Sequence, residues 1–387
     1  MPERTQGLAT GTLSADDLAA VLAPHHALTG KSLSVTGLRK SYNGTTVVDG
    51  VDMEIAAGEF VTFLGSSGSG KTTTLMMLAG FTEPDSGTVS VDGRDITRLN
   101  PGKRDFGFVF QQYLLFPHMT VAENVAFPLQ LRGVAKPEIR RRVAETLEAA
   151  GLSKFAGRRP RELSGGQQQR VALCRVLVYR PPIVLMDEPL GALDKKLRDQ
   201  MQTEIKSIQR ELGLTVIYVT HDQEEALVLS DRIAIMKDGL IEQFDTPRGL
   251  FERPRTPFVA DFLGAANFLP GTVEDGGDSG STRVRLDSGG VLTARAHPCV
   301  PGRRVRAAVR PGRLRLCGAE ESCCTGVVET AVYVGSLTRI TVRPDGAAPG
   351  TPPLRIETAA TPPRPGERVN VSAEPDDISI FDDVDGG

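Results

Sequence analysis

The stretch that decides the fold is residues 59–80, which read EFVTFLGSSGSGKTTTLMMLAG. An apolar run is followed by a glycine-rich loop, and the loop leads into a helix-favouring segment that ends at Gly80. The loop matches the pattern Gly65-x4-Gly70-Lys71-Thr72, in which backbone N–H groups turn inward around phosphate oxygens and Thr72 can ligate Mg²⁺. The alternative is a flexible Gly/Ser loop, but a strand before the loop and a helix after it favour a phosphate-binding site.

Strand-like and helical segments alternate on both sides of this loop. The runs EFVTFL, FGFVFQ, PPIVLMDEP and LTVIYVTH read as strands, and an amphipathic helix from Leu193 to Leu212 ends at Gly213. Turn signals typical of hairpins occur at Asn43-Gly44, Asp92-Gly93 and Asp238-Gly239. Short apolar strands that alternate with helices predict a parallel α/β sheet.

Two other regions have a different pattern. Residues from about 115 to 180 read as mostly helical, with a capping box at Thr120–Glu123. After Gly264, short alternating runs such as TRVRLDSG and RVNVSAEP are separated by turns, as in an all-β sandwich or barrel. We expect a flexible extension over residues 1–30 with a short helix from Asp16 to Leu22. We expect an α/β nucleotide-binding domain over 31–265 with the helical part inside it, and an all-β domain over 266–387.

The composition excludes several classes of protein. The formal net charge of the 387 residues is −3, so nothing indicates bulk affinity for nucleic acid. No apolar run approaches the length of a membrane span, and the first 30 residues lack the apolar core of a signal peptide. The five cysteines form no CxxC pair. We therefore expect reduced thiols and a cytoplasmic protein.

Charged side chains follow two of the predicted buried strands. IVLMDEP ends in Asp187 and Glu188, and VIYVTH ends in His221. The carboxyl ends of parallel strands face the ligand crevice, so Asp187 is a candidate Mg²⁺ ligand and Glu188 a candidate base that deprotonates an attacking water. The alternatives are a surface Asp-Glu pair at a turn and a histidine that only packs or caps.

A second glycine-rich helix start lies at RELSGGQQQRVAL, residues 161–173. Ser164 is placed to cap this helix, and Gly165 and Gly166 leave its first N–H groups uncovered, as at an anion site. If one chain binds one triphosphate, this helix needs the triphosphate of another chain. A head-to-tail dimer with two-fold symmetry meets that need. The alternative is a capped helix with a purely structural role.

Over about residues 33–250 the chain resembles the ATP-binding subunits of ABC transporters. GSSGSGKT is similar to the Walker A motif, LSGGQ to the ABC signature, IVLMDE to Walker B and LGALD to the D-loop, while Gln111 and Tyr42 resemble the Q-loop glutamine and the A-loop aromatic residue. The resemblance implies catalytic roles for Glu188, His221, Lys71 and Gln111, and Mg²⁺ ligation by Thr72, Gln111 and Asp187. It implies that ATP is contacted by Tyr42, Gly65, Ser66, Ser67, Gly68, Ser69, Gly70, Lys71, Thr72, Thr73, Ser164, Gly165, Gly166, Gln167 and Asp194.

The C-terminal part resembles the OB-like β-barrel appendage called TOBE, and the whole is most similar to importers of the spermidine/putrescine group. This implies an ATPase of the translocase class, in which closure of a head-to-tail dimer on ATP and Mg²⁺ drives uptake of a polyamine. Two integral-membrane permease subunits and, indirectly, an extracytoplasmic solute-binding protein are the implied partners, together with a second copy of the chain. The implied location is the cytoplasmic face of the cell membrane, without nucleic acid as a partner.

Other functions stay open at this point. The solute can instead be iron(III), sulfate, a sugar or a phosphonate-type compound. A soluble ABC ATPase that acts on nucleic acid or ribosomes is disfavoured by the single P-loop and the lack of a heptad run, and a GTPase by the lack of a guanine-reading motif. One departure from the family is Cys174, in CRVL where relatives have ARAL, and we expect it to pack rather than to react.

Overall fold

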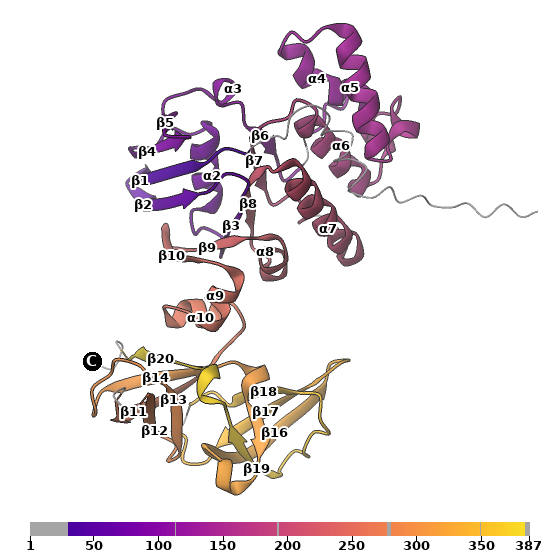
Figure 1. Ribbon diagram of the computed structural model, residues 1–387. Helices are drawn as coiled ribbons and strands as arrows, with labels where there is room; N and C mark the ends of the chain where they lie inside the picture. The colour runs from indigo at the N-terminus through magenta and orange to yellow at the C-terminus, as the bar shows by residue number, and fades with distance from the viewer. Residues whose placement is uncertain (1–29, 113, 192, 277–279, 349, 384–387) are drawn as a thin grey trace, which may run out of the picture. The chain divides into compact units, whose positions relative to one another are not determined.

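Figure 1 shows the computed structural model, which describes residues 30–112, 114–191, 193–276, 280–348 and 350–383. Apart from Gly30, the predicted flexible extension and its helix from Asp16 to Leu22 lie outside the described residues. The chain divides into two units between Pro247 and Arg248, and each is described by itself. No described helix combines the length and the apolar character that crossing a bilayer requires.

A six-stranded sheet forms the centre of the first unit, in the order β10-β9-β3-β8-β7-β6. All neighbours from β9 to β6 pair in parallel, and β10 pairs antiparallel with β9 at one edge. This confirms the predicted parallel α/β sheet. The strands are β3 (Phe60–Gly65), β6 (Gly107–Val109), β7 (Ile183–Asp187), β8 (Thr215–Thr220), β9 (Arg232–Lys237) and β10 (Leu240–Asp245).

Both faces of this sheet are buried, because successive side chains of a strand point to opposite sides. In β8, Val216 and Tyr218 pack into a core with helices of the first unit, whereas Ile217 and Val219 pack into a second core on the other face. In β7, the same division separates Val184 and Met186 from Ile183 and Leu185. The need to fill two cores explains the continuous apolar runs of these strands.

A four-stranded antiparallel sheet, β2-β1-β4-β5, shares the second core with α2. Its turns are the predicted ones, since Asn43 and Gly44 have φ of 50° and 81°, and Asp92 and Gly93 have φ of 47° and 75°. Two successive residues with positive φ suit the right-handed twist of a hairpin. The elements are β1 (Leu33–Tyr42), β2 (Thr45–Ile55), α2 (Lys71–Ala79), β4 (Ser86–Val91) and β5 (Arg94–Asp95).

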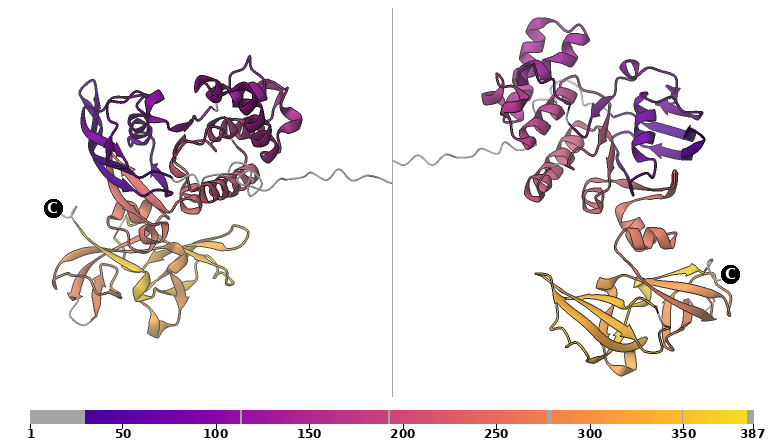
Figure 2. Two further views of the ribbon diagram at one scale, coloured as in Figure 1. Left: turned by 45° about the horizontal axis from the view of Figure 1, so that its top comes forward. Right: turned by 180° about the vertical axis from the view of Figure 1, so that it is seen from behind.

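The region predicted to be helical, residues 115–180, contains three helices, α4 to α6. Thr120 begins α4 with the predicted capping box, in which its hydroxyl accepts from the backbone N–H of Glu123. In Figure 2 these helices (purple to magenta) and the antiparallel sheet (indigo) lie on opposite sides of the parallel sheet. The remaining helices of this unit are α3 (Pro101–Arg104), α4 (Val121–Leu131), α5 (Lys136–Ala149), α6 (Gly165–Leu177), α7 (Lys195–Leu212) and α8 (Gln223–Leu229).

The second unit contains two short α-helices and two five-stranded antiparallel sheets with an apolar core between them, and a smaller apolar cluster joins α10 to the strands. The sheets have the orders β13-β12-β11-β14-β20 and β15-β19-β16-β17-β18, and they confirm the predicted all-β class. The elements are α9 (Pro247–Glu252), α10 (Pro257–Phe262), β11 (Asn267–Asp275), β12 (Ser281–Leu286), β13 (Val291–Arg295), β14 (Arg304–Val309), β15 (Arg315–Cys317), β16 (Cys324–Tyr333), β17 (Thr338–Pro344), β18 (Leu354–Thr358), β19 (Arg368–Ser372) and β20 (Ile378–Asp382).

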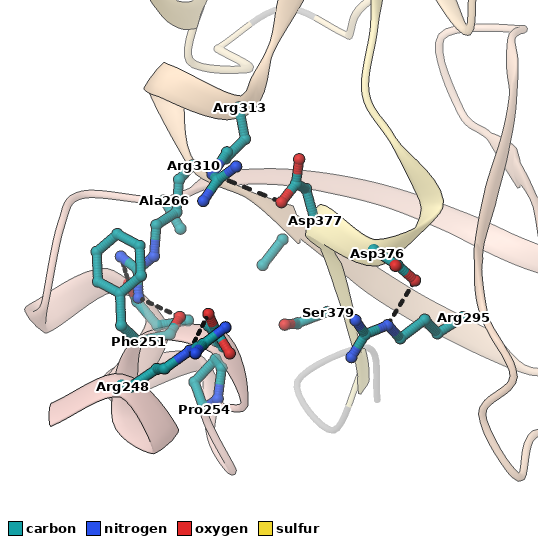
Figure 3. Close-up of a pocket in the computed structure, with 13 residues that line it drawn as sticks. Arg248, Phe251, Pro254, Ala266, Arg295, Arg310, Arg313, Asp376, Asp377 and Ser379 are labelled. Carbon is teal, nitrogen blue, oxygen red and sulfur yellow. Dashed lines mark hydrogen bonds and ion pairs between the residues drawn. The ribbon is translucent and has the colours of Figure 1, made fainter. Parts of the chain in front are cut away.

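The domain boundary predicted between residues 265 and 266 lies inside this second unit, because one arginine holds α9 and α10 against the strands. The guanidinium of Arg310 donates to the carbonyl oxygens of Ala260, Leu263 and Phe251 at 3.2, 3.0 and 3.1 Å. Its guanidinium also lies over the ring of Phe251 (Figure 3), with Cζ 3.8 Å from the ring centroid. Burial lowers the pKa of Arg310 to about 10.

Candidate functional site

The P-loop lies where β3 ends and α2 begins, and the backbone there requires glycine. A side chain at Gly65 would collide with the carbonyl oxygen of Met236. Gly70 has φ of 96°, and a Cβ there would lie 2.6 Å from the carbonyl oxygen of Val47. The loop is therefore confined between β9 of the parallel sheet and β2 of the antiparallel sheet. The N-terminus of α2 follows the loop, and its backbone N–H groups favour an anion.

Lys71 begins α2 and is only 5% exposed. Its ammonium donates to the carbonyl oxygens of Gly65 and Ser66 at 2.9 and 2.7 Å. Burial lowers the pKa of Lys71, while the carboxylates of Glu188 and Asp187 oppose that shift. The loop thus holds a buried positive charge beside its own backbone, in the place that the sequence predicted for phosphate binding.

Asp187 and Thr72 meet at the ends of two different elements, β7 and α2. The hydroxyl of Thr72 donates to Oδ1 of Asp187 at 3.2 Å. Burial raises the pKa of Asp187, and the hydrogen bond from Thr72 partly offsets the rise. A hydroxyl and a carboxylate beside a phosphate-binding loop are the oxygen donors that suit Mg²⁺, so these two residues fit the predicted metal.

Glu188, His221 and Gln111 converge on one another from three adjacent strands. They follow β7, β8 and β6, whose order in the sheet is β8-β7-β6. Nδ1 of His221 lies 3.2 Å from Oε1 of Glu188, and the amide of Gln111 donates to Oε2 of Glu188 at 3.3 Å. Glu188 has φ of 43°, a strained value for a residue with a side chain, and its N–H donates to the carbonyl of Val219.

A cavity of roughly 510 Å³ joins the P-loop to this group, a volume in the range of small-molecule sites. Most of its lining was predicted from the sequence, but Val47 was not. Val47 lines the cavity because the hairpin of β1 and β2 contacts the P-loop. This tertiary contact has no local sequence signal. The lining residues are Val47, Ser67, Gly68, Ser69, Gly70, Lys71, Thr72, Thr73, Glu188 and His221.

Outside the signature segment, four predicted contacts of the nucleotide are not among the residues that line this cavity: Tyr42, Asp194, Ser66 and Gly65. Tyr42 ends β1, is 46% exposed, and has the ammonium of Lys40 at 5.5 Å from its ring. The carboxylate of Asp194 caps α7 by accepting from the N–H of Leu197 at 3.0 Å. Ser66, although part of the P-loop, presents its carbonyl to Lys71 and is exposed.

The signature segment also lies outside the lining of this cavity. Ser164 and Gln167 form a capping box on α6, in which each side chain accepts from the other's backbone N–H at 3.4 and 3.0 Å. Ser164 and Gly165 are exposed, whereas Gly166 is buried against Leu197. Within one chain, the two glycine-rich helix starts are therefore not brought together around one ligand.

Cys174 lies in the middle of α6 and is 1% exposed within the helical core. Burial raises the pKa of its thiol to about 12. A thiol that stays protonated and enclosed is unreactive, so Cys174 packs, as predicted.

Comparisons with known proteins agree with this geometry. A family model described as ABC transporter matches residues 48–191, and one described as TOBE domain matches residues 307–381. The spermidine/putrescine import ATP-binding protein PotA of Thermobifida fusca is 51% identical over 322 residues, which are 81% of this chain and 83% of that protein. PotA of Rubrobacter xylanophilus is 48% identical over 88% of this chain and 91% of its own length. The chain belongs to the ABC transporter family.

Solved structures of ABC transporter cassettes resemble the first unit. The ATP-binding cassette MJ0796, solved as a dimer in a post-hydrolysis state with ADP and Pi, is 38% identical with a TM-score of 0.51, over 56% of this chain and 99% of that one. As a member of this family the chain binds nucleotide and is the ATP-hydrolysing subunit of a transporter. The GTPase alternative is therefore wrong, and the TOBE match confirms the expected class of the second unit.

Proposed function

We propose that this ABC transporter subunit hydrolyses ATP to drive the import of a polyamine such as spermidine or putrescine. The observation that carries the proposal is the likeness to relatives named for spermidine/putrescine import, at 48–51% identity over 81–88% of the chain. The likeness extends from the first unit into the second, because these alignments are longer than the first unit.

In the proposed site the P-loop binds the phosphates of ATP. Backbone N–H groups of Gly65 to Thr73 and the ammonium of Lys71 surround the β- and γ-phosphates, and Tyr42 stacks on adenine. Thr72, Asp187 and Gln111 would hold Mg²⁺, which supplies charge neutralisation on the phosphate oxygens. The fit rests on the 3.2 Å approach of Thr72 and Asp187 described above.

Glu188 is the proposed base. It orients a water and takes its proton while the water oxygen forms a bond to the γ-phosphorus, and the bond from that phosphorus to the bridging oxygen breaks to release ADP. His221 and Gln111 hold one carboxylate oxygen each, at 3.2 and 3.3 Å, so the carboxylate keeps one orientation. His221 also contacts the γ-phosphate in this proposal.

Two copies of the chain would complete two sites. The exposed Ser164 and Gly165, with Gly166, Gln167 and Asp194, would contact the phosphates bound to the partner's P-loop in a head-to-tail dimer. The dimeric cassettes to which this chain is similar support that arrangement. The isolated chain is then a poor ATPase at low concentration.

Separate permease subunits would form the pore, which places this chain at the cytoplasmic face of the membrane. A groove on α4 and α5 supports the docking of a permease helix on the helical part. Its apolar floor is made by Ala122, Ala126, Ile139 and Val143. The extracytoplasmic solute-binding protein acts on this chain indirectly, and the second unit has a regulatory or dimer-bracing role rather than a nucleic-acid partner.

The variant Glu188→Gln tests the ATPase part of the proposal. The amide keeps the shape of the side chain but cannot accept a proton, so we expect ATP binding within about 3-fold of wild type and turnover lower by about 10²–10³. The dimer should accumulate with MgATP, as measured by size-exclusion chromatography with light scattering. Wild-type turnover with only monomer present would contradict the role of Glu188.

Uptake by a reconstituted transporter tests the solute. The chain and its co-purified permeases, placed in liposomes with the solute-binding protein, should take up labelled spermidine or putrescine only with ATP on the side of the ATPase. Uptake of iron(III), sulfate, a sugar or a phosphonate instead would overturn the polyamine assignment but not the ATPase. Recovery of ribosomes or nucleic acid in place of permeases would overturn import itself.

A further inference from the structure

Arg198, in the first turn of α7, contacts both loops that carry the proposed catalytic side chains. Its Nη1 donates to Oδ2 of Asp222 at 3.0 Å, and its Nη2 donates to the carbonyl oxygen of Leu193 at 3.1 Å. Asp222 directly follows His221, and Leu193 lies in the loop that runs from Glu188 to Asp194. One guanidinium therefore joins the end of the Glu188 loop to the His221 loop.

A buried acid continues this connection behind His221. Glu225 is 2% exposed, and its Oε1 lies 3.6 Å from Nε of Arg198. Its Oε2 accepts from the hydroxyls of Tyr218 and Thr220 at 2.8 and 2.9 Å. Tyr218 and Thr220 are in β8, so the carboxylate ties the strand before His221 to the helix after it.

Asp222 and Thr220 hold the backbone beside His221. The N–H of Asp222 donates to the hydroxyl of Thr220 at 3.0 Å, and Oδ1 of Asp222 caps α8 through the N–H groups of Glu224 and Glu225. His221 itself is 62% exposed, so little packing holds its ring. Apart from its contact with Glu188, the position of the ring therefore depends on the backbone on either side of it.

Arg198 does not line the cavity at the P-loop. Loss of its charge would leave Glu225 buried without this cation and would free the carbonyl of Leu193, but it would not remove a group that touches the phosphates. Its effect should therefore fall on the geometry between Glu188 and His221, and errors of about 1 Å in catalytic geometry can cost about 100-fold in rate.

We propose that Arg198 is a positioning residue that holds the Glu188–Asp194 loop and the His221 loop in one register, as hydrolysis requires, without a part in nucleotide binding. The inference rests on the proposed function of Glu188 and His221. A guanidinium suits this role because its planar set of N–H groups can donate to a carboxylate and to a carbonyl at the same time. The ammonium of a lysine does this less well.

The test compares Arg198→Gln with Arg210→Gln in the full-length chain. Arg210 is an exposed arginine in the last turn of the same helix, so it matches the change in charge and helix propensity. We expect kcat of Arg198→Gln to fall by about 10- to 100-fold while the Kd for MgATP, measured by titration calorimetry, changes by less than about 3-fold. Arg210→Gln should behave as wild type, and Arg198→Lys should recover part of kcat.

A second variant separates positioning from a general loss of stability. Asp222→Asn keeps a good helix cap and removes the charge that Arg198 contacts. It should lower kcat by several-fold without lowering the melting temperature, and the double variant with Arg198→Gln should be no slower than Arg198→Gln alone. Additive losses in the double variant would show that the two side chains act independently, which would overturn the proposal.

Two other results would overturn it. One is wild-type kcat in Arg198→Gln, and the other is a joint fall of MgATP affinity and melting temperature that accounts for the lost activity. Failure of the proposed role of Glu188 would be recognised separately, because Glu188→Gln would then turn over at the wild-type rate. If Glu188→Gln stops turnover and Arg198→Gln does not affect it, only the inference about Arg198 fails.

Discussion

At the scale of single residues, the Ser164 hydroxyl caps α6, and we propose that it also contacts the nucleotide of the partner chain. It accepts from the N–H of Gln167 at 3.4 Å and so caps α6, and it is exposed at a helix start that favours an anion. A cap requires only an oxygen acceptor, whereas a phosphate contact also requires the absence of negative charge. The two roles therefore respond differently to an aspartate.

Ser164→Asp should keep α6 stable and stop turnover. Aspartate caps a helix as well as serine does, so we expect a change in the free energy of unfolding within about 0.5 kcal/mol. Its negative charge would repel the partner's nucleotide, so kcat should fall by at least about 100-fold while MgATP binding to the chain's own P-loop persists. Denaturant melts, binding titrations and steady-state ATPase assays measure the three quantities.

The matched control is Thr120→Asp, which places the same charge in the capping box of α4. It should leave turnover nearly unchanged, with some loss of stability because the new carboxylate lies beside that of Glu123 and the hydroxyl that donates to Glu123 is lost. Normal turnover in Ser164→Asp would mean that Ser164 only caps a helix, and the cross-dimer site would then lose its main support.

Cys174 predicts a pH dependence of stability at this scale. Burial raises the pKa of its thiol from 9.0 to about 12 in the folded chain. Because the unfolded chain ionises this thiol first, the associated stability is complete below about pH 9 and is lost progressively as the pH rises towards 12. Native protein at pH 8 should not be alkylated at Cys174 by iodoacetamide, as mass spectrometry would detect, and Cys174→Ala should reduce the alkaline loss of stability. Rapid native alkylation would contradict the enclosed position.

At the scale of elements, α9 and α10 depend on a side chain that is distant in the sequence. Arg310 donates to carbonyl oxygens of α9, of α10 and of Leu263, and its Nη1 lies 2.6 Å from the place where a Cβ of Gly264 would stand. Gly264 has φ of 145°, a conformation open to glycine, so the chain passes close to the guanidinium there. These contacts make α9 and α10 part of the second unit.

Arg310→Leu should loosen α9 and α10. Three backbone carbonyls would lose a charged donor, at a cost of about 2 kcal/mol in the free energy of unfolding. Hydrogen exchange of residues 248–264 should become faster than in wild type, and urea melts should give the change in stability. Arg313→Leu is the control, because the exposed Arg313 donates no hydrogen bond to these carbonyls and only pairs with the partly buried Asp377 at 3.5 Å, so it should change stability by at most about 1 kcal/mol. Equal exchange in Arg310→Leu and wild type would contradict this role.

At the scale of the whole molecule, the apolar cores of the two units are separate. The first unit contains the two cores on either side of the parallel sheet, and the second contains the core between its two antiparallel sheets. The cavity at the P-loop is lined by residues of the first unit alone. Nucleotide binding should therefore directly stabilise the first unit.

Calorimetry of Glu188→Gln with and without MgATP should show this. We expect two unfolding transitions, one for each unit. MgATP at about 100 times its Kd should raise the melting temperature of the first unit by about 5–10 °C and leave that of the second unit unchanged. Lys71→Ala should remove the shift by removing the buried ammonium from the P-loop. A single transition that moves as a whole would mean that the two units unfold together.

The sequence by itself determined most elements of this protein, because their signals are local. Asn43-Gly44 and Asp238-Gly239 favour positive φ at two successive positions, and the capping boxes at Thr120 and Ser164 each lie within four residues. The P-loop can be predicted from the sequence for the same reason, since its glycines, lysine and threonine lie within eight consecutive residues, 65–72. Because strands of one parallel sheet end at one edge, the sequence also predicts that the side chains after β7 and β8 lie near each other, and His221 does lie beside Glu188.

Tertiary structure alone decided which distant groups meet. Gln111 and Glu188 are 77 residues apart and touch because β6 and β7 are neighbours, an order that packing on both sheet faces selects. Val47 at the cavity, Arg198 between two loops and Arg310 on α9 and α10 have no local signal, since each acts through contacts with segments far away in the chain. The predicted boundary at residue 265 differs from the division of the structure at residue 247 for this reason: composition changes at Gly264, but the contacts of Arg310 reach back to Phe251.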